Sequence, residues 1–147
     1  MHVPDPLSPA DSAVDDLAAA LAPRYRVLSV SSRGDVPYQV DVVDLVGVLR
    51  QFGFRTPVLV GERLGCVTAL VAAAWYPERV AGLILVEPAF DPPASESLAA
   101  RGLRDCPPDP GRLRAAVRCS VLERTRPTHL DKTARRAVEA FLAATLP

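Results

Sequence analysis

A short glycine-flanked segment holds the residues of this chain that are best placed for chemistry. Residues 59–70 read LVGERLGCVTAL, an apolar run followed by a tight turn and the start of a helix. Many enzymes place a nucleophilic serine at the centre of such a turn, in the pattern G-x-S-x-G. Here the turn is Gly61-Glu62-Arg63-Leu64-Gly65, with Arg63 at the central position. A guanidinium group stays protonated and has no lone pair with which to attack a carbonyl carbon, so Arg63 is not a nucleophile.

Four other side chains are candidates for a catalytic role. Cys66 lies in the first turn of the predicted helix, where backbone N–H groups favour a reactive thiolate, although a buried inert thiol is the alternative. Ser32 and Glu87 each follow a predicted strand, at the edge where α/β sheets bind ligands. Ser32 is otherwise a turn residue, and Glu87 is otherwise an ion-pair partner of an arginine. His129 is the candidate general base, or else a solvated residue near a helix start.

Arg63 also permits anion binding. An arginine beside the free N–H groups of a helix N-terminus is suited to a carboxylate or a phosphate. Two alternatives stay open: Glu62 neutralises the arginine, or the arginine has no selected role.

The composition excludes several classes of protein. The 147 residues carry a formal net charge of zero, so no basic field attracts nucleic acid, and no partner of that kind is expected. Apolar stretches stop well short of the roughly 20 residues of a membrane span, and the N-terminus does not have the pattern of a secretory signal. The cysteines at positions 66, 106 and 119 fit neither a disulfide framework nor a zinc site. We therefore expect a cytoplasmic protein with no metal and no cofactor.

Hydrophobic periodicity predicts alternating helices and strands. Helices are predicted over residues 12–22, 42–52 and 64–76, and short apolar strands over residues 26–30, 57–60 and 81–86. This alternation predicts an α/β fold with a parallel sheet and crossover helices. Trp75 and Tyr76 are expected in the core, and Gly53 is expected to end the second helix.

The last third of the chain differs in composition from the rest. It opens with a proline-rich polar stretch, and residues 112–123 are compatible with a helix or, near their end, with a strand. A final amphipathic helix is predicted, with Thr128 as its cap. Its apolar face is expected to contain Leu130, Ala134, Ala137, Val138, Phe141 and Leu142.

From about residue 17 to residue 90 the chain resembles the α/β-hydrolase superfamily, of the esterase, haloperoxidase and epoxide-hydrolase type. The similar segments come in family order: LAPRYRVLSVSSRG, VVDLVGVLRQFGF and PVLVGERLGCVTALVAAAWYPERVAGLILVEPAF. The resemblance implies a three-layer α/β-hydrolase-like parallel sheet, incomplete, with about three recognisable strands and a helical C-terminal part. It implies a single domain over residues 1–147, with core units in 1–90, a cap-like segment in 91–128 and a C-terminal helix in 129–147.

Two departures from the family bear on function. The family's elbow serine is replaced by Arg63, and the chain starts near the end of the family's third strand, with His2 as a trace of its oxyanion turn. We expect a gap in the sheet beside residues 57–60. Exposed strand edges then predict a homodimer or an aggregation-prone protein.

The tail has two interpretations. In one, it is the family's closing segment, where His129 matches the second of two histidines and the catalytic position falls near Arg126. In the other, it consists of cap helices.

The functional expectation is an α/β-hydrolase-fold pseudoenzyme with a binding or scaffold role and a small-molecule ligand as its partner. The alternatives are an active hydrolase of an ester or related acyl substrate, with Cys66 or Ser32 as nucleophile, and a small-anion-binding module at Arg63.

Overall fold

A central parallel sheet organises the molecule. The computed structural model describes residues 2–3, 13–31, 38–63, 65–88, 114–124 and 131–147. Its strands are β1 (His2–Val3), β2 (Val58–Glu62), β3 (Gly82–Val86) and β4 (Ser120–Arg124). They lie in the order β1-β2-β3-β4, and all three pairings are parallel. The predicted α/β fold with a parallel sheet is confirmed.

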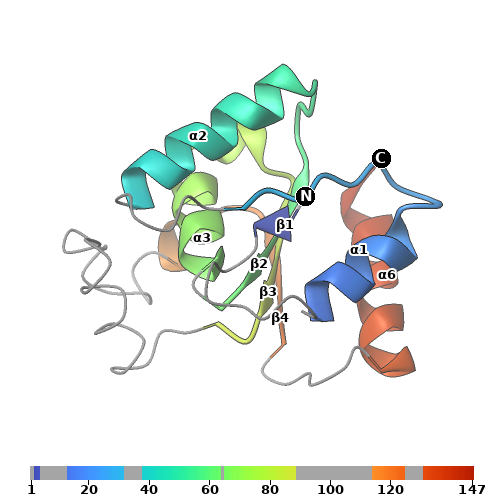
Figure 1. The fold of residues 1–147 in the computed structure, drawn as a ribbon. Helices are drawn as coiled ribbons and strands as arrows, with labels where there is room; N and C mark the ends of the chain where they lie inside the picture. Colours follow the sequence, from blue (N-terminus) through green and yellow to red (C-terminus); the bar gives the residue numbers. More distant parts are fainter. Residues whose placement is uncertain (1, 4–12, 32–37, 64, 89–113, 125–130) are drawn as a thin grey trace.

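Helices cover both faces of this sheet (Figure 1). The helical elements are α1 (Ala13–Leu21), α2 (Tyr38–Gln51), α3 (Gly65–Trp75), the 3-10 turn η1 (Pro77–Arg79) and α6 (Lys132–Thr145). α2 and α3 lie on one face, and α1 and α6 lie on the other. The described part of the chain therefore has three layers.

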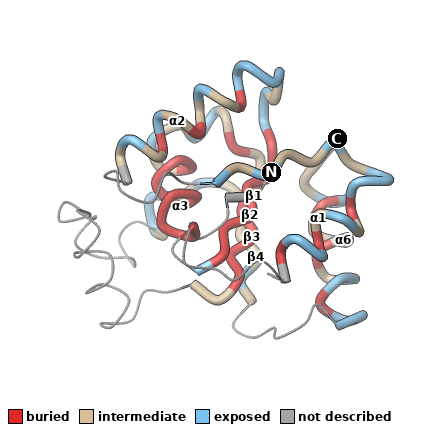
Figure 2. The backbone as a smooth tube through the Cα atoms, viewed as in Figure 1, coloured by how far each residue is buried: buried red, intermediate tan, exposed pale blue. Residues whose placement is uncertain are grey.

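Two apolar clusters fill the spaces between the layers. Leu59, Leu83 and Leu85 face α2 and α3, whereas residues between them in sequence, such as Val60 and Ile84, face α1 and α6. Successive side chains of a strand point to opposite faces, so continuous apolar runs are what a doubly covered sheet needs. Figure 2 shows this burial along β2, β3 and α3.

The predicted strands over residues 57–60 and 81–86 correspond to β2 and β3, but the predicted strand over residues 26–30 is wrong. That segment has a single β-bridge, at Ser29. Its side chains still alternate, with Leu28 and Val30 on the α2–α3 cluster and Val27 on the other. The alternating pattern thus predicted the burial correctly, whereas a strand also needs a ladder of hydrogen bonds with a neighbour.

The expected gap beside β2 is partly filled. β1 pairs with the second half of β2, with His2 opposite Val60 and Val3 opposite Gly61. The first residues of the chain therefore occupy the place where the sequence analysis expected a missing strand, and that expectation is wrong for these two positions. The homodimer or aggregation expected from exposed strand edges remains a prediction.

Gly53 ends α2 as expected. Its φ is +71°, and the N–H of Phe54 donates to the carbonyl of Leu49 over 2.8 Å. The N–H of Gly53 donates to the carbonyl of Arg50 over 3.1 Å, which completes a Schellman motif. A left-handed residue is needed at this point, and glycine adopts that conformation without steric cost.

The prediction that Trp75 lies in the core is wrong. Its side chain is 47% exposed, while Tyr76 beside it packs against the α2–α3 cluster. Trp75 is the last residue of α3, beyond the buried stretch of this helix, which ends at Ala73.

The C-terminal part belongs to the sheet. The sequence left residues 112–123 open between a helix and, near their end, a strand; residues 120–124 form the strand β4 beside β3. α6 begins after Asp131, whose carboxylate accepts a 2.7 Å hydrogen bond from the N–H of Ala134. Asp131 rather than Thr128 is therefore the cap, and Thr128 and Leu130 lie outside the described residues. Ala134, Val138 and Leu142 are buried, and the latter two pack against the sheet, so α6 is a core helix rather than a cap helix.

No helix in the described residues combines the length and the apolar character needed to cross a membrane.

Candidate functional site

The turn between β2 and α3 has a constrained backbone. Arg63 has a φ of 50°, in the left-handed region that costs a non-glycine residue about 1 kcal/mol. Its N–H donates to the carbonyl of Val86 over 2.9 Å, and its carbonyl accepts from the N–H of Cys66 over 3.2 Å. These two hydrogen bonds tie the turn to β3 and to the first turn of α3. The side chain of Arg63 is exposed at the carboxyl end of the sheet.

Gly61 allows the strand and the helix to approach each other closely. A Cβ at this position would lie 2.7 Å from the carbonyl oxygen of Gly65 and 2.8 Å from both the Cα and the N of Cys66. These are backbone atoms, so they can move only if α3 moves. Gly61 therefore has a packing role, which the glycine-flanked sequence pattern indicates but does not explain.

Cys66 is fully buried. Its Sγ lies 3.2 Å from the carbonyl oxygen of Gly61 and 3.6 Å from that of Val86, close enough for the thiol to donate to either. The side chain thus lies between β2, β3 and its own helix, and no substrate reaches it in this conformation. The structure favours a packed thiol over a nucleophile at this position.

Glu87 occupies the turn after β3, beside the elbow. Its φ is 47°, and its N–H donates to the carbonyl of Arg124 over 2.8 Å. Glu87 and Arg63 are the non-glycine residues with positive φ in the described part of the chain, and they follow neighbouring strands. Left-handed residues are enriched at functional sites, and the carboxyl edge is where α/β sheets bind ligands.

Two more charged residues lie at this edge: Glu62, which the sequence analysis considered only as an elbow residue that neutralises Arg63, and Arg124, which it missed. Glu62 pairs in register with Val86, and Val86 pairs with Arg124, so the three lie in one row across the sheet. Glu62 is only 5% exposed although it is a carboxylate. Its burial could be anticipated only from its position at the end of an apolar strand. The row adds an acid and an arginine to the edge that carries Arg63 and Glu87.

The remaining candidates, Ser32 and His129, lie outside the described residues, as do Arg126 and Cys106. The position of His129, the general base expected from the sequence, is therefore not tested. Within the described ranges no three His, Cys, Asp or Glu side chains come close enough to hold a metal ion.

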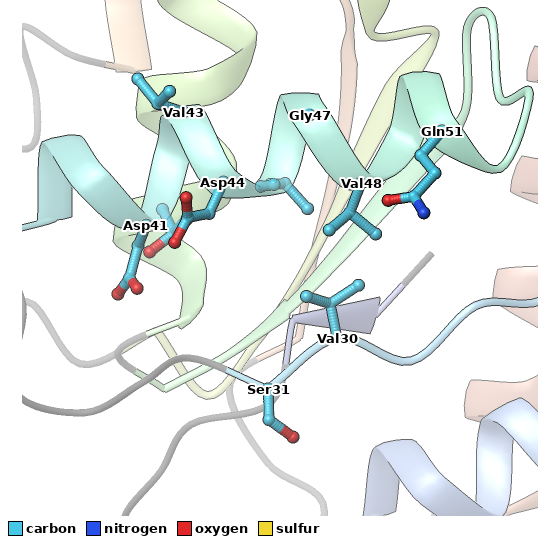
Figure 3. Close-up of a pocket in the computed structure, with 10 residues that line it drawn as sticks. Val30, Ser31, Asp41, Val43, Asp44, Gly47, Val48 and Gln51 are labelled. Carbon is cyan, nitrogen blue, oxygen red and sulfur yellow. The ribbon is translucent and has the colours of Figure 1, made fainter.

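A groove of about 500 Å³ lies between α2 and residues 30–31 (Figure 3). Asp41 and Asp44 project from α2 towards the side where Ser31 lies, and Val48 faces Val30. The buried hydroxyl-bearing residue Thr68 of α3 also lines this groove. The groove is acidic and contains neither the elbow nor Glu87.

A second groove, of about 530 Å³, lies at the opposite edge of the sheet, near the start of β2. Arg24, Arg26 and Arg55 line it. Sequence reasoning missed these residues because they come from two segments about 30 positions apart; the available signal was that aromatic residues adjoin arginines in both, in RYR and in FR.

The parallel sheet with helices on both faces, and the tight turn between β2 and α3, define a three-layer α/β protein with a strand–turn–helix elbow. No family model matches the chain, and comparisons with curated proteins and with solved structures found no match either.

Proposed function

We propose that this chain is an α/β-hydrolase-like binding protein that lacks serine-hydrolase activity. The observation that carries the proposal is the side chain at the elbow: Arg63 is exposed at the end of β2 but is not a nucleophile. The one nucleophilic group that the described residues place beside this turn, Cys66, is buried against backbone carbonyls. The resemblance in sequence and the parallel sheet support the hydrolase-like part of the proposal.

Covalent labelling of the folded protein tests this proposal. We expect no adduct in the intact mass after treatment with a fluorophosphonate probe, because the described elbow holds no nucleophile. A serine hydrolase added to the same reaction serves as the positive control. Rapid stoichiometric phosphonylation of one serine would overturn the proposal in favour of an active hydrolase of an ester or related acyl substrate, and peptide mapping would then name the nucleophile.

Alkylation of the folded protein with iodoacetamide tests whether its cysteine thiols are reactive. Cys66 is expected to react only after unfolding in urea. Cys119 is half-buried, and this burial raises the pKa of its thiol, although a backbone hydrogen bond and the charge of Arg114 act in the opposite direction. A raised pKa leaves less thiolate near neutral pH, so Cys119 should alkylate more slowly in the folded protein than in the unfolded chain. Fast labelling confined to Cys66 would contradict the proposal and indicate a thiol mechanism.

Binding of a small anion at Arg63 is the second candidate function. It is favoured by the exposed side chain of Arg63, which lies within the constrained turn just before α3. We expect phosphate or acetate to raise the melting temperature, and the increase to disappear in Arg63→Ala. Arg50→Ala, which removes an exposed arginine from the last turn of α2, is the matched control and should keep the increase. An equal increase in all three proteins would reflect a general salt effect and exclude this site.

A further inference from the structure

The second groove combines basic side chains with an apolar floor. It is formed by residues 24–27 after α1, residues 53–58 before and at the start of β2, and the end of α6. Figure 1 shows the segment that follows α1 running beside the C-terminal end of the chain. This edge is opposite to the elbow, since β2 begins here and ends at Glu62.

Arg26 is held in place within this groove. Its guanidinium carbon lies 4.6 Å from the centroid of the Phe54 ring, and its Nη2 donates to the carbonyl of Phe52. Both partners lie just after α2, where the carbonyl groups of a helix end need donors. The fold therefore restrains the guanidinium group of Arg26, which lowers the entropic cost of binding a ligand there.

Arg24 and Arg55 add two exposed guanidinium groups, and neither forms an ion pair within the described residues. No aspartate or glutamate is among the side chains that line the groove in the described part of the chain. Pro147, the last residue described, also lines the groove, and the main-chain carboxylate of a chain that ends there offsets one of the three arginine charges. The remaining positive charge favours a negatively charged ligand, and an arginine fork can bind a carboxylate or a phosphate through two parallel hydrogen bonds.

The floor of the groove is apolar. Val58 and Val60 come from β2, and Leu142 and Leu146 come from the end of α6. The volume, about 530 Å³, is in the range of sites that bind small molecules. Val58, Val60 and Leu142 are buried, whereas Val27, Phe54 and Leu146, which also line the groove, are partly exposed. An inorganic anion would leave the exposed parts of these three side chains in contact with water, whereas a ligand with an alkyl or aromatic group would cover them.

We propose that this groove binds an amphipathic organic anion, a carboxylate or phosphate monoester that carries an alkyl or aromatic group. The anionic group contacts the arginines, and the apolar group lies over Val27, Phe54 and Leu146. The site is separate from Arg63 and does not depend on the proposed function.

Calorimetric titration with octanoate and with octyl phosphate tests the proposal. Both are expected to bind at least about tenfold more tightly than acetate or octylammonium, since each control lacks one half of the ligand. The double variant Arg24→Gln/Arg55→Gln should weaken octanoate binding by about tenfold or more. Arg26 is left intact because it contacts the end of α2.

Two controls make the result specific. Arg50→Gln/Arg136→Gln removes two exposed arginines from α2 and α6 and should leave binding unchanged. Arg63→Gln should also leave it unchanged, which separates this site from the elbow. Amide chemical-shift changes on addition of octanoate should concentrate in residues 24–27 and 53–58. Equal binding of octylammonium, an unaffected groove variant, or loss of binding in Arg63→Gln would each overturn the proposal.

Discussion

Gly61→Ala is expected to lower the free energy of unfolding by about 3 kcal/mol. The added methyl would approach the backbone of Gly65 and Cys66 to within 2.8 Å, and a real Cβ does not tolerate such a distance. To relieve the clash, α3 must move away from β2. That movement opens the α2–α3 cluster, in which α3 is buried over most of its length.

Gly47→Ala is the matched control for this substitution. Gly47 lies in the middle of α2, and a Cβ there would meet nothing within 4 Å. The same chemical change should therefore stabilise the protein by about 0.8 kcal/mol through helix propensity. Urea denaturation followed by circular dichroism measures both. Equal stabilities of the two variants would contradict the close packing of the elbow.

Val138→Asp is expected to cost about 4 kcal/mol, because it places an uncompensated carboxylate in an apolar contact. Val138 is 1% exposed and packs with the cluster that joins α6 to the sheet. Burial favours the protonated acid, so the loss should be smaller near about pH 4 than near about pH 7.

Ala140→Asp is the control, since Ala140 is exposed on the same helix and the charge change is identical. Ala140→Asp should lower the free energy of unfolding by less than about 1 kcal/mol. If the two variants were equally stable by thermal and urea unfolding, α6 would not be a core helix. The interpretation of the C-terminal part as cap helices would then be favoured.

The two edges of the sheet offer different chemistry. The carboxyl edge carries Arg63, Glu87 and the buried Glu62, with constrained turns but a mixed charge. The amino edge carries three arginines over an apolar floor. The labelling, melting and titration experiments address these edges separately, so a negative result at one does not bear on the other.

The sequence by itself predicted the helices and strands whose buried residues follow from the apolar pattern of the segment alone. Continuous apolar runs predicted β2 and β3, and helical periodicity over residues 12–22 predicted α1, whose buried face consists of Val14, Leu17 and Leu21. Gly53 was predicted as the end of α2 because its conformational freedom is a property of the residue. The replacement of a nucleophile by Arg63 was also evident from the sequence, since a guanidinium group has the same chemistry in any fold.

Tertiary structure alone decided the features that depend on a partner distant in sequence. Residues 26–30 have the alternation of a strand but lack a hydrogen-bonded ladder, and residues 120–124 became a strand because β3 lies beside them. Cys66 is buried because α3 places its side chain against the carbonyl groups of Gly61 and Val86. The basic groove exists because the ends of α1, α2 and α6 meet at the start of β2. Periodicity records which side of a segment is buried, but not which other segment buries it.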